Sequence, residues 1–122
     1  MITGIGMDMI ELDRMAKAME SERFVHRILT PKELEKFNCL KKSRQIEFLA
    51  GRFAGKEACS KALGTGIGKH LSWQDLSILN DSLGKPILHI KEAILGNHVV
   101  HISLTHTKTV ASAYVIIESL SG

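Results

Sequence analysis

Two charged residues, Glu57 and Lys61, stand one helical turn apart in a predicted helix. Glu57 follows Phe53 by one turn, and at about 100° per residue this places it on the apolar side of a helix. A carboxylate in such a place is costly unless a positive charge compensates it. That charge is either a basic side chain, such as Lys61, or a metal ion. Taken alone, these residues favour the basic side chain.

Further basic and acidic residues extend this candidate site. Arg52 and Lys56 are also one turn apart, and two neighbouring cations indicate either an external anion or a solvated helix face. Asp8 follows Gly4 and Gly6 at the end of a predicted strand, where an acid is commonly a turn residue or a helix cap and less often a metal ligand.

Glycines and a histidine complete the set of candidates. The run Gly64-Thr65-Gly66 can end a helix, and it can also let backbone N–H groups approach phosphate oxygens. It lacks the Gly-Lys-Ser/Thr ending of the Walker motif. His106 lies between two threonines, where a histidine is more often a structural hydrogen bonder than a catalyst.

The first half of the chain contains the elements that must position these residues. Residues 2–7 are predicted as a strand, and residues 11–27 have helical spacing. Thr30, followed by Pro31 and Glu33, forms a capping-box pattern that predicts a helix to about Asn38. The strongest helical segment covers residues 44–63.

The second half changes to strand patterns. Residues 76–79 and 87–90 flank a turn at 81–86, which predicts a hairpin. Residues 100–105 alternate between apolar and polar, and 111–117 is a predicted closing strand. We therefore expect a single α+β domain over residues 1–122, with helices of the first half packed on a small antiparallel sheet.

Composition narrows the class of protein. The 122 residues are 44% hydrophobic and 24% charged, with a formal charge of +3, which is typical of a folded protein and weakly basic for a nucleic-acid binder. There is no apolar run of membrane-spanning length and no secretory signal pattern. Cys39 and Cys59 are too few for a disulfide framework, so we expect reduced thiols and a cytoplasmic location. The α+β domain, the carboxylate on an apolar helix face, the nearby basic residues and the glycine-rich loop together predict a domain that binds an anionic ligand with a hard metal ion.

The order of several segments is more specific than any one of them. They are Gly4 to Glu11, Arg27 to Thr30, Glu47 to Ala58, Ser60 to Gly66, Gly84 to Pro86 and Ser103 to Thr107. Together they resemble the holo-acyl-carrier-protein synthase family, the small bacterial 4′-phosphopantetheinyl transferases. The resemblance implies that the chain has the phosphopantetheinyl-transferase fold. It also implies Mg²⁺-dependent transfer of 4′-phosphopantetheine from coenzyme A to a serine of apo acyl carrier protein, with release of 3′,5′-ADP, for fatty-acid biosynthesis.

The resemblance also implies roles for residues. Asp8 and Glu57 would bind Mg²⁺, Lys61 would contact the pyrophosphate and assist the leaving group, and Glu57 would act as the base directly or through a metal-bound water. The remaining coenzyme A-binding residues would be Arg44, Arg52, Gly64, Thr65, Gly66, Lys85, Pro86, His106 and Thr107.

Partners follow from the same resemblance. It implies a homotrimer with active sites between subunits, and docking of the acidic carrier protein on Arg14, Arg23, Phe24 and Arg27, with no nucleic acid and no membrane. Gly55 and Cys59 occupy positions where family members often carry other residues, and the mid-helix glycine should cost up to ~1 kcal/mol relative to alanine. The alternatives are a non-catalytic module that binds coenzyme A or a nucleotide, and a nucleic-acid binder.

Overall fold

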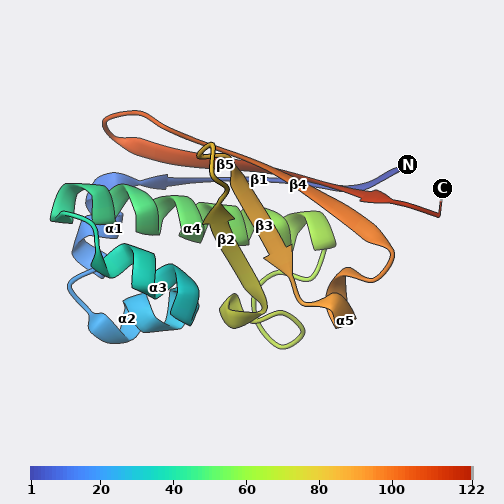
Figure 1. The fold of residues 1–122 in the computed structure, drawn as a ribbon, viewed down its shortest axis with the longest axis horizontal. Helices are drawn as coiled ribbons and strands as arrows, with labels where there is room; N and C mark the ends of the chain where they lie inside the picture. The colour runs from blue at the N-terminus through green and yellow to red at the C-terminus, as the bar shows by residue number, and fades with distance from the viewer. Residues whose placement is uncertain (122) are drawn as a thin grey trace.

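Five strands and five α-helices make up the fold of the computed structural model, which describes residues 1–121. In chain order they are β1 (Ile2–Glu11), α1 (Leu12–Ala18), α2 (Glu22–Ile28), α3 (Pro31–Asn38), α4 (Lys42–Leu63), the short 3₁₀ helix η1 (Trp73–Asp75), β2 (Leu76–Asn80), β3 (Pro86–Ile90), α5 (Glu92–Leu95), β4 (His98–His106) and β5 (Val110–Ser119) (Figure 1). None of these helices combines the length and the apolar character that crossing a bilayer requires.

The strands form two antiparallel sheets. The larger has the order β1-β5-β4, so the first strand of the chain pairs with the last, and Asp8 stands opposite Ala113. The smaller is the predicted hairpin of β2 and β3. Helix α4 lies along one face of the larger sheet (Figure 1). The α+β prediction is confirmed, with two sheets where the sequence predicted one.

Glycines allow α4 to approach β1 closely. A Cβ added to Gly6 would lie 1.9 Å from the carbonyl oxygen of Ala58, and one added to Gly4 would lie 2.0 Å from that of Ala62. Because no side chain fits in these gaps, the backbone of the helix rests directly on the backbone of the strand. This contact fixes the position of Asp8, two residues further along β1, relative to the last turns of α4.

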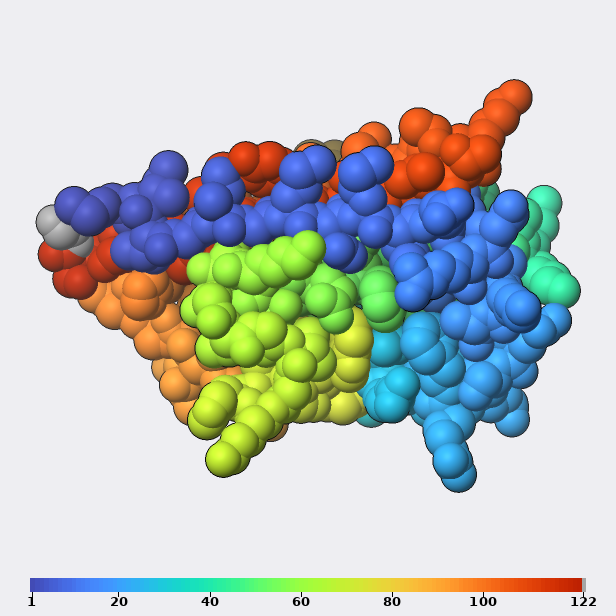
Figure 2. All heavy atoms as spheres, turned by 180° about the vertical axis from the view of Figure 1, so that it is seen from behind, coloured from blue at the N-terminus to red at the C-terminus, as the bar shows by residue number. Residues whose placement is uncertain are grey.

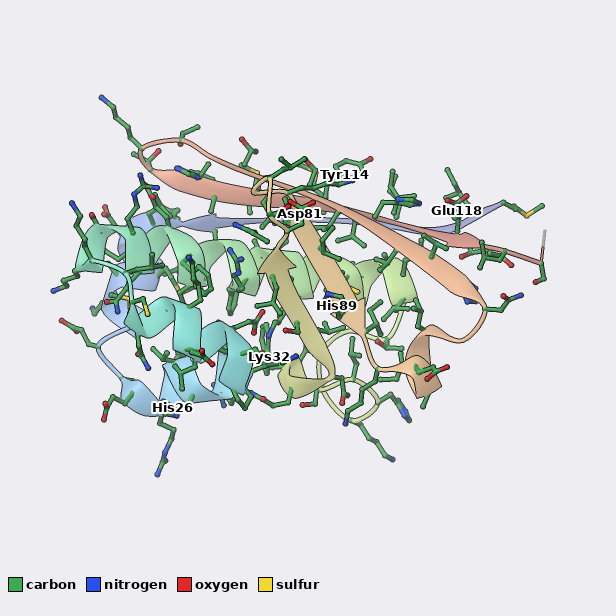
Figure 3. The ribbon with its side chains drawn as sticks, in the orientation of Figure 1. His26, Lys32, Asp81, His89, Tyr114 and Glu118 are labelled. Atoms are coloured by element: carbon green, nitrogen blue, oxygen red, sulfur yellow. The ribbon has the colours of Figure 1, made fainter. Side chains whose placement is uncertain are left out.

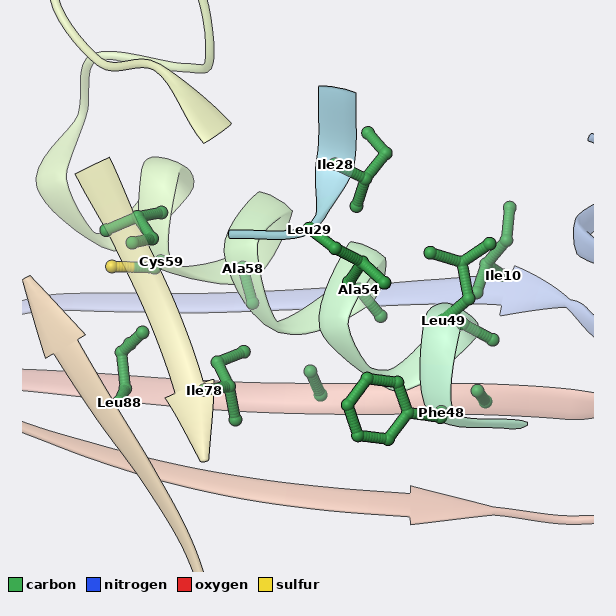
Figure 4. Close-up of a cluster of buried hydrophobic side chains, with 14 of the residues drawn as sticks. Ile10, Ile28, Leu29, Phe48, Leu49, Ala54, Ala58, Cys59, Ile78 and Leu88 are labelled. Atoms are coloured by element: carbon green, nitrogen blue, oxygen red, sulfur yellow. The ribbon is translucent and has the colours of Figure 1, made fainter. Parts of the chain in front are cut away.

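The core lies between α4 and the two sheets (Figure 4). Leu49, Ala54 and Ala58 of α4 are fully buried, and Ile78 of β2 and Val115 of β5 are fully buried against them. Helix α4 is therefore surrounded by protein on most sides, which explains why its sequence lacks a long polar face.

Local signals in the sequence located the bounds of α3 and the end of α4, whereas β1 continues four residues beyond its predicted end, so that Asp8 lies within the strand. The capping box of Thr30 and Glu33 is present, and Gly64 ends α4 in the left-handed conformation with φ of 81°. The predicted helical stretch 11–27 is instead two helices, because Ser21 begins α2 by accepting a hydrogen bond from the N–H of Phe24. Both cysteines are free, as predicted.

Candidate active site

Asp8 and Lys61 meet at the edge of the sheet, where β1 crosses α4. The ammonium Nζ of Lys61 donates to Asp8 Oδ1 at 3.2 Å and to the carbonyl oxygen of Met7 at 3.0 Å. The two side chains reach each other because Gly4 and Gly6 bring β1 against the helix. Lys61 remains half exposed, so its charge also faces solvent.

Glu57 lies one turn before Lys61 and is half-buried. Burial raises the pKa of its carboxyl group, the nearby negative charge of Asp8 raises this pKa further, and Lys61 opposes the shift. The expected alternative, a pair between Glu57 and Lys61, is not formed, because Lys61 pairs with Asp8. No side chain among residues 1–121 forms an ion pair with Glu57. Asp8, Glu57 and Lys61 are called the carboxylate cluster below.

The carboxylate cluster fits a magnesium ion whose remaining coordination positions are filled by substrate phosphates and water. No group of three His, Cys, Asp or Glu side chains able to hold a metal occurs in the described part of the chain. Mg²⁺ does not require one, since it is often bound by one or two carboxylates together with substrate phosphates and water. Burial and, to a lesser extent, the nearby charge of Asp8 raise the pKa of Glu57, and a bound cation would stabilise the ionised form of this carboxylate.

The glycine loop after α4 begins beside this cluster. The N–H groups of Gly64, Thr65 and Gly66 all point to the carbonyl oxygen of Ser60, at 3.0, 3.2 and 3.2 Å. The possibility raised by the sequence, that these amides cradle a phosphate, is therefore not met in this conformation. The exposed hydroxyl of Thr65, which donates to the Gly66 carbonyl oxygen, is the polar group that the loop presents.

A basic cavity of about 440 Å³ opens on the other side of α4. Four of the predicted coenzyme A-binding residues line it, namely Arg44, Arg52, Pro86 and His106. Its wall contains two further charged residues, Lys36 and Glu47, that were not predicted as binding residues from the sequence. Glu47 lies 3.4 Å from Nε2 of His106, and its place three residues after the predicted binding residue Arg44 puts both on one helix face.

Arg52 and Lys56 do not form the pair of free cations that their spacing indicated. Lys56 is fully buried, and its ammonium donates to Glu33 at 2.6 Å and to two backbone carbonyl oxygens. Arg52 donates to the carbonyl oxygen of Ile78 at 3.1 Å, and its guanidinium carbon lies 3.8 Å from the centre of the Phe48 ring. The external-anion interpretation is therefore wrong for Lys56, whose charge is neutralised internally.

Two further predicted binding residues, Lys85 and Thr107, lie neither in the wall of the basic cavity nor in the glycine loop. Lys85 is exposed in the β2–β3 turn, where its backbone N–H donates to Asp81 Oδ1 at 2.9 Å. The hydroxyl of Thr107 accepts from the N–H of Val110 at 3.1 Å in the β4–β5 turn.

The predicted coenzyme A site is thus divided between two places on one chain. Glu57 and Arg44 are about 20 Å apart along α4 at 1.5 Å per residue. Asp8 is on β1 and His106 is on β4, at opposite edges of the three-stranded sheet. One side presents carboxylates and the glycine loop, and the other presents arginines and a histidine.

The predicted carrier-docking residues lie on two short helices. Arg14 is exposed on α1, and Arg23 and Arg27 are exposed on α2. Phe24 is half-buried, and its ring packs against Phe53 of α4 with centroids 6.2 Å apart.

Comparison with known proteins accounts for this combination of fold and residues. The sequence model of the 4′-phosphopantetheinyl transferase superfamily, ACPS, matches residues 4–116. The chain belongs to this family. Family membership confirms the resemblance inferred from the order of the short segments.

Individual relatives match over nearly the whole chain. The holo-[acyl-carrier-protein] synthase of Bacillus velezensis is 54% identical over 99% of both chains, and that of Bacillus subtilis is 52% identical over 100% of both. A crystal structure of the Bacillus anthracis synthase in complex with CoA (3′,5′-ADP) has a TM-score of 0.91, 50% identity and 98% coverage of both chains. The Helicobacter pylori synthase in complex with coenzyme A has a TM-score of 0.83 and 31% identity, over 93% of this chain and 99% of that chain.

Proposed function

We propose that this chain is a single-domain enzyme that transfers 4′-phosphopantetheine from coenzyme A to a serine of apo acyl carrier protein and releases 3′,5′-ADP. The observation that carries this function is the carboxylate cluster, in which two acids and a lysine meet beside a glycine loop within a fold of this transferase family. The serine oxygen forms a bond to the β-phosphorus, and the bond from that phosphorus to the ADP oxygen breaks.

Glu57 is the base in this proposal. A carboxylate with a raised pKa holds a proton more readily than an ordinary glutamate, which suits it to accept the serine proton near neutral pH. Lys61, which is half exposed and held by Asp8, supplies positive charge to the pyrophosphate and to the departing ADP oxygen.

Asp8 and Glu57 would hold the Mg²⁺ ion. When bound, Mg²⁺ supplies charge neutralisation for the diphosphate. In its absence Lys61 partly neutralises Asp8, while Glu57 has no ion-pair partner among residues 1–121.

The basic cavity would receive the adenosine phosphate end of coenzyme A. Arg44 supplies positive charge and hydrogen-bond donors, His106 supplies a ring nitrogen for hydrogen bonding, and Arg52 contributes from the cavity wall. Since this cavity and the carboxylate cluster lie at opposite edges of the sheet, we propose that one complete site combines the cluster of one copy with the cavity of a neighbouring copy.

An uncovered sheet face supports such an assembly. On the side of the sheet away from α4, Ile5, Met7, Met9 and Tyr114 are 57, 49, 59 and 42% exposed. Tyr114 and Glu118 project from this side of the sheet (Figure 3). A contiguous apolar patch of this kind marks an interaction surface, and we assign it to association of copies of this chain as a homotrimer. Sedimentation of the protein as a 13.5 kDa monomer at working concentration would contradict this assignment.

The activity is tested by mass spectrometry of the carrier. Apo acyl carrier protein is incubated with the enzyme, coenzyme A and Mg²⁺, and the expected result is the mass increment of one phosphopantetheine group. A module that only binds coenzyme A or a nucleotide would leave the carrier mass unchanged. We propose a cytoplasmic role in fatty-acid biosynthesis, without a nucleic-acid or membrane partner.

A further inference from the structure

The ammonium of Lys61 occupies the carboxylate cluster in the way that a bound cation does. Its Nζ donates to two oxygens of consecutive residues of β1, the carbonyl oxygen of Met7 at 3.0 Å and Asp8 Oδ1 at 3.2 Å. The side chain of Asp8 is 18% exposed and that of Lys61 is 53% exposed, so the lysine lies on the solvent side of the pair. One of the two carboxylates proposed to hold Mg²⁺ is therefore already paired with a positive charge.

The ammonium is held in place but is able to leave. Figure 2 shows the blue surface of β1 directly above the green surface of the last turns of α4, so the contact between these two elements lies at the surface of the chain. Lysine carries its charge on a flexible four-carbon stem, and an exposed ion pair of this kind is weak. Lys61 can therefore exchange the carboxylate of Asp8 for another anion without a change in the backbone.

The charges of the cluster disfavour a metal ion that arrives alone. Two acids and one lysine leave the cluster with a net negative charge, and Mg²⁺ alone reverses that sign. The metal ion also meets the ammonium on the same carboxylate, where like charges repel strongly at short range. Mg²⁺ that arrives with a diphosphate leaves the net charge as it was, because the diphosphate brings two negative charges. The diphosphate also offers the ammonium new oxygen partners.

We propose that Lys61 is a stand-in cation, which weakens the binding of Mg²⁺ to Asp8 until a diphosphate draws the ammonium away; the inference rests on the proposed function. The contact of Lys61 with Asp8 is then autoinhibitory toward the metal ion alone. No covalent bond forms or breaks in this exchange. Since coupling between two ligands is reciprocal, coenzyme A strengthens metal binding by the same factor by which the metal strengthens binding of coenzyme A. The complete metal site forms only when the donor is present.

Metal binding to the intact protein without coenzyme A tests this exchange. Mn²⁺ is the probe, because it prefers the same oxygen ligands as Mg²⁺, and the free ion is measured by electron paramagnetic resonance. Lys61→Met removes the ammonium and keeps a long side chain, whereas Lys69→Met removes a charge from an exposed position on the loop after α4. We expect Lys61→Met to bind Mn²⁺ at least ~10-fold more tightly than the wild type, and Lys69→Met to change the affinity by less than ~2-fold. Equal affinities of Lys61→Met and the wild type, or equal gains in both variants, would overturn the proposal.

The effect of coenzyme A on metal binding provides a second comparison. The same titrations are repeated with coenzyme A, and the Mn²⁺ that coenzyme A binds by itself is subtracted. We expect coenzyme A to increase the Mn²⁺ affinity of the wild type by a factor at least ~5-fold larger than that of Lys61→Met, because only the wild type has an ammonium to displace. Equal factors would show that Lys61 does not couple the two ligands.

The place of the metal ion is checked with a double variant. Asp8→Asn combined with Lys61→Met should lose the tight Mn²⁺ binding of Lys61→Met. If the double variant keeps that binding, the metal ion is held elsewhere and the proposal is wrong.

A labelling experiment on the wild type keeps the proposal testable if Lys61→Met fails to fold. The protein is acylated at lysine by an N-hydroxysuccinimide ester, and the modified peptides are quantified by mass spectrometry. Saturating Mg²⁺ should release Lys61 from Asp8 and increase its labelling rate, while the rate of Lys69 stays the same. Unchanged labelling of Lys61 would contradict the exchange.

Failure of the proposed function gives a different result from failure of this inference. If the wild-type enzyme modifies no carrier in the mass assay, the transferase proposal fails. If it modifies the carrier while Lys61→Met and the wild type bind Mn²⁺ equally, only the role of Lys61 as a stand-in cation fails.

Discussion

Lys61 holds Asp8 at 3.2 Å, although the two residues are 53 positions apart in sequence. Their contact depends on the backbone approach of β1 to α4, and it leaves Glu57 as the half-buried acid beside them, with a raised pKa. The three side chains therefore form one electrostatic unit, and removal of either negative charge should change catalysis more than folding.

The first prediction concerns the two carboxylates. Asp8→Asn and Glu57→Gln should each lower turnover by at least ~100-fold, because each removes a charge from the proposed metal site at a phosphoryl centre. Stability should be retained in Glu57→Gln. A raised pKa means that the ionised carboxylate is disfavoured in the folded state, so this penalty is present at pH 7, above the unfolded pKa, and the substitution removes it.

Steady-state kinetics and thermal unfolding measure these two effects. Glu92→Gln, at an exposed position on α5, is the matched control and should leave both unchanged. Normal turnover of Glu57→Gln at limiting Mg²⁺ would refute the proposed role of this acid.

The second prediction concerns the contact between β1 and α4. Gly6→Ala should destabilise the protein by about 1–3 kcal/mol or more, because its Cβ would meet the backbone of Ala58 and Ala62, which cannot move aside as a side chain can. Turnover should fall as well, since Asp8 moves with the strand. The measurement is chemical denaturation together with the mass assay.

Gly51→Ala is the informative comparison. The nearest atom to its added Cβ is Leu104 Cδ1 at 3.7 Å, an ordinary contact. It should therefore stabilise the helix by about 0.5–1 kcal/mol. If Gly6→Ala and Gly51→Ala change the free energy of unfolding by similar amounts, the close contact between β1 and α4 at Gly6 does not explain the effect of the substitution.

Gly55 shows why the sequence alone could not predict the effect of replacing a helical glycine by alanine. Helix propensity predicts that this glycine costs up to ~1 kcal/mol relative to alanine. In the fold, an added Cβ would lie 2.5 Å from Ile78 Cδ1 and 3.1 Å from Ile102 Cδ1. The cost therefore depends on contacts with strands that lie far away in sequence, and propensity alone does not contain them.

The same difference between local signals and contacts made far away in sequence applies to the other predictions. Signals within a few residues of one another, such as the cap at Thr30 and the left-handed Gly64, predicted element ends correctly. The partner of Lys56 is Glu33, which reads in sequence only as the third residue of a capping box. Pairing across α3 and α4 depends on tertiary packing, so the helical spacing of Arg52 and Lys56 gave the wrong interpretation.

The third prediction addresses that buried pair. Glu33→Gln should destabilise the protein by about 3–5 kcal/mol, because it keeps the hydrogen-bond shape but leaves Lys56 without a neutralising charge. Glu35→Gln, exposed on the same helix, should change the free energy of unfolding by no more than about 0.5 kcal/mol.

The difference in stability between the wild type and Glu33→Gln should depend on pH in a definite direction. Burial lowers the pKa of Lys56 from 10.5, Glu33 raises it and Arg52 lowers it. In Glu33→Gln the pKa of Lys56 should fall further. The folded variant is therefore destabilised at every pH at which Lys56 is charged in the unfolded state. The stability gap between wild type and Glu33→Gln should therefore narrow as the pH is raised from 7 toward 10. A gap that widens over this range would contradict the charge explanation.

The last prediction concerns the docking of the carrier protein. Acyl carrier proteins are acidic, and the exposed side chains of Arg14, Arg23 and Arg27 project from α1 and α2, where Phe24 offers a half-buried apolar contact. Arg14→Glu should raise KM for the carrier at least ~10-fold and leave KM for coenzyme A nearly unchanged, because a reversed charge repels the acidic partner.

Arg44→Glu, in the basic cavity, should do the opposite and raise KM for coenzyme A. Raising the salt concentration from about 50 to 300 mM should reproduce the Arg14→Glu effect in the wild-type enzyme, since screening weakens exposed charge pairs. If Arg14→Glu raises KM for coenzyme A and spares the carrier, α1 and α2 bind the nucleotide and the carrier must dock elsewhere.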